Sequence, residues 1–168
     1  MKKTLIRRMS NRVLGMVARF APGATSLRPF LHKLRGVRIE GRVFIGDDVY
    51  LENEFPECIE VHDGAQICLR STLIAHTRGE GRIVIGKNAF IGANCVLTAA
   101  PGVTLTIGEG AVLTTSSVVS SNVQPFTLMG TAKAQPLAQV KNPLTMETPY
   151  KQFVAGLRPL KGKSNAPK

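Results

Sequence analysis

The sequence predicts an all-β solenoid, and a period of six residues is the main observation behind that prediction. Aliphatic residues, with one glycine among them, recur at steps of six at Val61, Ile67, Leu73, Gly79, Ile85, Ile91 and Leu97. Small side chains follow four residues later at Ala65, Ser71, Thr77 and Ala89. A period of six matches neither the 3.6-residue period of a helix nor a strand of ordinary length. It is typical of short strands separated by tight corners, with aliphatic side chains filling a narrow prism.

The same phase continues on both sides of this stretch. The outer positions are Ile39, Ile45 and Leu51 before it, and Ile107, Leu113 and Val119 after it. The joins from Leu51 to Val61 and from Leu97 to Ile107 are ten residues long, so each predicts a four-residue loop pushed out from a corner. Glycine follows the aliphatic residue at positions 46, 86, 92 and 108, where a turn favours a residue without Cβ.

The charge of the chain divides it into three parts. Residues 1–38 hold ten Lys or Arg and no acid, whereas residues 39–140 hold six basic and ten acidic residues. The net charge of +11 therefore belongs to the ends and not to the repeats. We expect a basic helical segment over residues 1–36, a solenoid domain over 37–135 and a partly disordered C-terminal extension over 136–168. Within that extension, a short helix is expected near Tyr150–Leu157.

The N-terminal segment has the pattern of an amphipathic helix. Apolar residues at helical spacing are Leu5, Ile6, Met9, Val13, Val17 and Phe20. Ala21-Pro22-Gly23 ends this helix, and a second one is expected from Leu27 to Leu34. The segment would cap the open edge of the first coil, lie on an anionic membrane surface through residues 1–35, or do both, with one helix as cap and the other on the membrane. Neither helix has an apolar run long enough to span a membrane. The basic residues have no aromatic residues among them, which disfavours nucleic acid as a partner.

The cysteines and histidines bear on compartment and metal binding. Three cysteines without close pairing predict reduced thiols and a cytoplasmic protein, with Cys95 packed inside the coil. His32 is expected to be solvated among basic residues, and His62 to be a turn residue in His62-Asp63-Gly64. A three-histidine zinc site is not expected, since only two histidines lie in the repeats.

The strongest candidate for a catalytic site is found by stacking the repeats along the axis of the coil. Counting each ten-residue join as one step, three hexapeptides per coil place Leu51, Leu73, Ile91 and Leu113 on one face. Three residues beyond each lie Glu54, His76, Asn94 and Ser116, which should form a polar column. The loop that begins at Glu52 and Asn53 leaves the solenoid above His76. Histidine suits general base catalysis near neutrality, and a nearby carboxylate would orient it. The alternative is an exposed histidine at a turn.

Several stretches of the chain resemble a known family. "IVIGKNAFIGANCVL" and "IGEGAVLTTSSVVSSNVQPFTLMGTAKA" are similar to hexapeptide-repeat acyltransferases, which fold as left-handed β-helices. The resemblance covers about Gly36 to Ala134. "RGVRIEGRVFIGDDVYLENEFPECIEV" and "LIAHTRGEGRIVIG" look closer to the O-acetyltransferases of polysaccharide and lipopolysaccharide assembly.

The resemblance implies a homotrimer with active sites between subunits, acetyl-CoA as the acyl donor and a sugar hydroxyl as the acceptor. His76 matches the position of the family's catalytic base, and the stacking of the repeats makes Glu54 its acidic partner, with no metal expected. The remaining implied contacts are Glu52, Asn53 and Asn94 for the acceptor, Ala93 and Thr115 for the pantetheine arm, and Ser120, Ser121 and Lys133 for the nucleotide end.

The sequence thus leads to two hypotheses of different classes. The first is a CoA-dependent O-acetyltransferase acting on a cell-surface polysaccharide or a lipid-linked glycan precursor. It would be cytoplasmic and peripheral on the inner face of the membrane. The second is a catalytically inactive solenoid that serves as an assembly subunit, because a fold does not fix a function.

Overall fold

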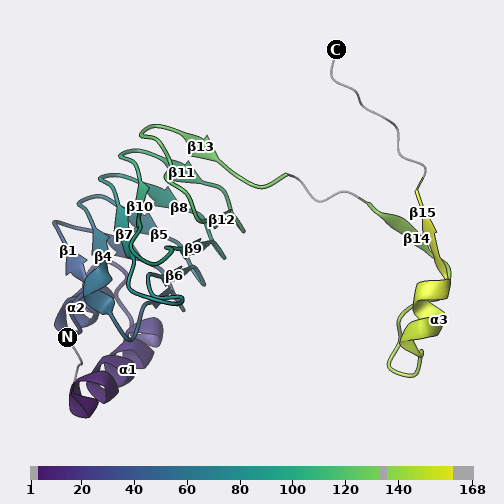
Figure 1. Cartoon of the computed structure of the whole chain (residues 1–168), viewed down its shortest axis with the longest axis horizontal. Helices are drawn as coiled ribbons and strands as arrows, with labels where there is room; N and C mark the ends of the chain where they lie inside the picture. The colour runs from purple at the N-terminus through teal and green to yellow at the C-terminus, as the bar shows by residue number, and fades with distance from the viewer. Residues whose placement is uncertain (1–3, 133–135, 161–168) are drawn as a thin grey trace. The chain divides into compact units, whose positions relative to one another are not determined.

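Short parallel strands wind into a solenoid of about four turns, as the six-residue period predicts (Figure 1). This computed structural model describes residues 4–132 and 136–160. The first sheet contains β1 (Arg38–Ile39), β4 (Ile59–Val61), β7 (Arg82–Ile85) and β10 (Thr104–Ile107). The second contains β2 (Phe44–Ile45), β5 (Gln66–Ile67), β8 (Phe90–Ile91), β11 (Val112–Leu113) and β13 (Leu128–Met129). The third contains β3 (Tyr50–Leu51), β6 (Thr72–Ile74), β9 (Val96–Thr98) and β12 (Val118–Val119).

The aliphatic residues of the repeat fill the interior of the coil. In the second sheet, Ile45 pairs with Ile67, Ile67 with Ile91 and Ile91 with Leu113, so that like side chains stack along the axis. All four are fully buried, and burial of such side chains is the main stabilising term of the coil. Cys95 also lies in this core, as predicted, and all three cysteines are free thiols.

Two of the three corners have constant length. The first sheet connects to the second through 40–43, 62–65, 86–89 and 108–111, and the second to the third through 46–49, 68–71, 92–95 and 114–117. The third corner leads back to the first sheet through residues 52–58, 75–81, 99–103 and 120–122, and we call it the loop corner. Residues 52–58 include the 3-10 helix η1 (Pro56–Cys58). Both loops predicted from the ten-residue joins therefore exist, and both leave the same corner.

The predicted polar column is wrong, and the reason lies at Gly79. This glycine is not a rung of the coil but part of the loop 75–81, so Leu73 leads directly to Ile85 in the next strand. The face shared by Leu51 and Leu73 continues with Leu97, not with Ile91. As a result Asn94 and Ser116 turn between the second and third sheets, where both adopt positive φ. Only Glu54 and His76 of the four lie at the loop corner.

The glycines that follow the aliphatic positions make room for the neighbouring coil. A Cβ on Gly92 would lie 2.7 Å from Leu113 O and from Thr115 N, closer than a carbon can approach. Equally short distances to backbone atoms of the next coil arise at glycines 46, 86 and 108. These glycines are therefore required by the stacking of the coils rather than by left-handed φ.

The N-terminal segment caps the first coil. Its helices are α1 (Leu5–Phe20) and α2 (Leu27–Leu34), with the predicted limits. Ala24 O accepts a hydrogen bond from Ile45 N at 2.8 Å, and Arg28 Nη1 donates to Ile45 O at 3.0 Å. Arg35 Nη2 donates to Leu51 O at 2.7 Å and also to Glu52 O. Unpaired groups at a strand edge attract other chains. Two buried arginines satisfy them here, which is the contact that a cap would make.

The described residues after Thr131, namely Ala132 and 136–160, belong to a second compact unit. In it, β14 (Ala138–Val140) pairs antiparallel with β15 (Leu157–Pro159), and the helix α3 (Tyr150–Ala155) precedes β15. The helix near Tyr150 was predicted, whereas the hairpin was not. The expected disorder of the Lys, Ser, Asn and Pro end lies outside the described residues. Among the described residues, the helices are too short or too polar to span a bilayer.

Candidate functional site

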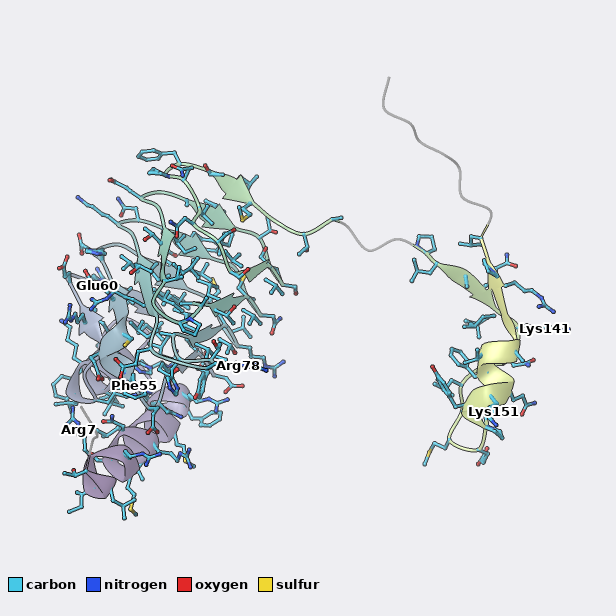
Figure 2. The ribbon with its side chains drawn as sticks, in the orientation of Figure 1. Arg7, Phe55, Glu60, Arg78, Lys141 and Lys151 are labelled. Atoms are coloured by element: carbon cyan, nitrogen blue, oxygen red, sulfur yellow. The ribbon has the colours of Figure 1, made fainter. Side chains whose placement is uncertain are left out.

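The loop corner holds the candidate catalytic histidine. His76 follows β6 in the loop 75–81, where it forms an isolated antiparallel bridge with Glu80. Its half-buried ring contacts the ring of Phe55 in the loop 52–58, with centroids 4.6 Å apart and planes at 53°. Figure 2 labels Phe55 and Arg78, one residue from each of these two loops. Two loops from successive coils thus pack against each other through an aromatic ring and an imidazole.

Backbone hydrogen bonds fix the loop that carries His76. Gly81 N donates to Ala75 O at 2.7 Å and closes the loop at its base. Gly102 N, in the next loop along the axis, donates to Glu80 O at 2.8 Å. Since this loop is closed at its base and bonded to the loop 99–103, the imidazole is presented from a defined backbone.

The acidic loop is tied to the N-terminal cap. Glu54 Oε1 lies 2.6 Å from Arg8 Nε, and Glu54 N donates to Glu52 Oε1 at 2.8 Å. Glu52 itself is buried, with 4% of its surface exposed. A Cβ on Gly15 of α1 would lie 2.5 Å from Asn53 Oδ1, so the Asn53 side chain is packed against α1. Glu54 as the partner of His76, and Glu52 and Asn53 as acceptor contacts, stay predictions.

The other predicted contacts divide between two corners. Ser120 and Ser121 are exposed in the connection 120–122, so they share the loop corner with His76. Ala93, Asn94 and Thr115 lie at the corner between the second and third sheets, where Asn94 and Thr115 are exposed. Lys133 lies outside the described residues. Within one chain, therefore, the candidate nucleotide contacts approach the histidine corner, and the candidate pantetheine contacts do not.

Sequence reasoning missed a buried polar cluster under α1. His32 was expected to be solvated, but it is fully buried, with Nδ1 3.4 Å from Arg35 Nη1. Burial, and then the Arg35 guanidinium, lowers the pKa of His32 to about 3. Burial also lowers the pKa of Arg35 to about 10, against the opposing influence of Tyr50 and Glu52. The backbone carbonyls at the open edge of the first coil need hydrogen-bond donors, and the arginines of a basic cap can donate to them. That need was the signal available in the sequence.

His62 is the first residue of the turn 62–65, as predicted, with Ala65 N donating to His62 O at 3.2 Å, and its side chain also contacts two carboxylates. Its Nδ1 is 2.7 Å from Glu40 Oε2, and its Nε2 is 3.1 Å from Glu60 Oε1. One ligand atom from each of these residues lies within 4.8 Å of the others, which is close enough to hold a metal ion. Arg38 and Arg82 also approach Glu60 Oε2, at 3.8 and 3.5 Å. Both ring nitrogens and the Glu60 carboxylate thus already have protein partners. The 22-residue spacing of Glu40 and His62, one coil apart, was the available sequence signal.

Comparison with known protein families, with characterised proteins and with solved structures gave no match.

Proposed function

We propose that this protein is a CoA-dependent O-acetyltransferase of the hexapeptide-repeat kind, moving an acetyl group from acetyl-CoA to a sugar hydroxyl. The observation that carries the proposal is the half-buried imidazole of His76, held against Phe55 at the corner where the coil extends its loops. The resemblance of the repeats to polysaccharide and lipopolysaccharide O-acetyltransferases supplies the reaction.

In the proposed reaction, His76 acts as general base and then as general acid. The imidazole takes the proton of the acceptor hydroxyl as its oxygen attacks the thioester carbonyl. The C–S bond then breaks, and the imidazolium returns the proton to the departing thiolate, so the enzyme ends unchanged. Holding the two substrates in this geometry would supply several kcal/mol of the barrier reduction. Backbone N–H groups at the corner would stabilise the oxyanion.

The proposal includes a homotrimer, which would bring the two separated groups of residues together. His76, Ser120 and Ser121 lie at one corner of a coil, and Ala93, Asn94 and Thr115 lie at another. If the loop corner of one subunit faces the second-to-third corner of its neighbour, acetyl-CoA can run along the groove between them. Glu52, Asn53 and Glu54 would then contact the glycan acceptor from the loop 52–58.

Turnover by a single-residue variant tests this function. We expect the wild-type chain to release free thiol from acetyl-CoA when supplied with its sugar acceptor, and His76→Ala to lose this activity. CoA should raise the melting temperature of both proteins, because binding to the folded state stabilises it and does not need the base. The kcat/KM value should fall toward acid pH, because a protonated imidazole cannot accept the hydroxyl proton.

His62→Ala is the matched control, because it removes another half-buried histidine of the solenoid that lies at a different corner. It should retain turnover. Equal activity of wild type and His76→Ala would exclude His76 as the base. A chain that neither binds CoA nor releases thiol with any member of a sugar panel would instead support an inactive assembly subunit.

A further inference from the structure

The helix α1 is packed with its apolar side outward. The residues it buries are Asn11, Gly15 and Ala18, which are polar or small. The large apolar residues are more than half exposed, namely Leu5, Ile6, Met9, Val13, Met16, Val17 and Phe20. At 100° per residue, these seven side chains cover a continuous arc of about 120° on the far side of the helix. We call this arc the apolar face of α1. An ordinary surface helix has the opposite arrangement.

Capping the solenoid does not account for this face. Several edge groups of the first coil are satisfied by residues outside α1, namely Ala24, Arg28 and Arg35. The contribution of α1 is Arg19 O, which accepts a hydrogen bond from Asp48 N at 2.8 Å, and Arg19 is not part of the apolar face. The attachment of α1 to the coil uses other atoms, such as Arg19 Nε, which donates to Asp48 Oδ1 at 2.9 Å. Seven exposed apolar side chains in one arc are unusual on a protein without a partner at that surface.

The charges beside the apolar face indicate what the partner is. Arg8, Arg12 and Arg19 follow one margin of the arc at helical spacing, and residues 1–38 contain no acid. The Arg8 and Arg19 side chains keep 53% and 34% of their surface exposed while they pair with Glu54 and Asp48. A second copy of α1 would oppose these arginines with arginines. An anionic lipid surface offers both a hydrocarbon layer for the arc and negative headgroups for its margin.

We propose that the apolar face of α1 inserts into the surface of an anionic membrane, with the helix lying in the plane of the interface. Because Arg8 binds Glu54, docking of α1 brings the loop 52–58 close to the headgroups. The proposal depends on α1 alone and holds whether or not the coil is an enzyme.

Vesicle flotation of the full chain tests the proposal. Wild type should float with vesicles of phosphatidylglycerol and phosphatidylcholine, and binding should fall in high salt because the headgroup attraction is screened. Val13→Asp should lower the partition coefficient at least about tenfold, since it removes apolar area and adds a negative charge. Val118→Asp in β12 is the matched control, because Val118 is another exposed valine, with 71% of its surface accessible compared with 58% for Val13. It should float like wild type.

A tryptophan reporter gives an independent readout, because the chain has no tryptophan of its own. In Phe20→Trp, fluorescence should shift to the blue on adding anionic vesicles and be quenched by brominated lipid. In Phe126→Trp, at an exposed position remote from α1 in the sequence, it should not.

Four results would overturn the proposal. They are no flotation of wild type, equal flotation with purely neutral vesicles, unchanged flotation of Val13→Asp, and no quenching at position 20. If Val13→Asp separates an oligomer in solution while wild type does not bind vesicles, the face is an interface between copies and not a membrane anchor.

Discussion

Mild acid should destabilise the fold through His32. This imidazole is fully buried beside the Arg35 guanidinium, and its pKa falls from the ordinary 6.5 to about 3. Between these values the unfolded chain binds one proton that the folded chain rejects. Stability is therefore complete above pH 6.5 and declines by about 1.4 kcal/mol for each pH unit below it. At pH 5, His32 alone should lower the free energy of unfolding by about 2 kcal/mol relative to pH 7.

Urea unfolding followed by far-UV circular dichroism at pH 7 and pH 5 measures this loss. His32→Gln keeps an acceptor for Arg35 and cannot titrate, so its stability should fall by about 2 kcal/mol less than that of wild type over the same interval. Equal losses in wild type and His32→Gln would refute the reasoning. In case the variant folds poorly, the NMR shift of the wild-type His32 ring should stay that of a neutral imidazole at pH 5.

Three further outcomes follow from the packing of the coil. Gly92→Ala should lower the free energy of unfolding by about 1–3 kcal/mol in urea denaturation, because its Cβ would meet the backbone of the next coil; an unchanged midpoint would contradict the close stacking. Arg35→Met should destabilise by about 3 kcal/mol in the same assay, since two strand-edge carbonyls lose a charged donor; a neutral effect would show that the cap is dispensable. Burial raises the pKa of the Cys95 thiol, and that of Cys68 as well. In the native protein, Cys95 should therefore react with a disulfide reagent far more slowly than Cys58, as measured by mass spectrometry of labelled peptides, and equal rates would exclude the buried position.

The repeat itself could be predicted from the sequence, because each coil is specified locally by an inward aliphatic residue and two tight corners. The register between coils could not be predicted equally well. The twelve residues from Leu73 to Ile85 fit two rungs or one rung and a loop, and Gly79 happens to fall in phase. A glycine in an aliphatic series was the warning, because it has no side chain to contribute to the core. That single choice moved Asn94 and Ser116 to the wrong corner.

For the helices, prediction from the sequence had a different limit. Amphipathic spacing located α1 and α2, but it does not state which side faces the protein. For α1, the pattern would bury Leu5, Met9 and Val13, whereas the coil binds the side with Asn11 and Gly15. Likewise, the basic composition did not reveal that Arg28 and Arg35 are internal hydrogen-bond donors, since this depends on where the first strands end in space.

The unequal corners separate what the scaffold holds constant from what it can vary. Every insertion in the coil falls at one edge, where 52–58 and 75–81 have seven residues and 99–103 has five, while each of the other two turns keeps four. Residues can be added or removed at that edge without displacing a single layer of aliphatic side chains. The coil can thus serve as a constant scaffold, and new recognition loops can be grafted at the loop corner with little risk to folding.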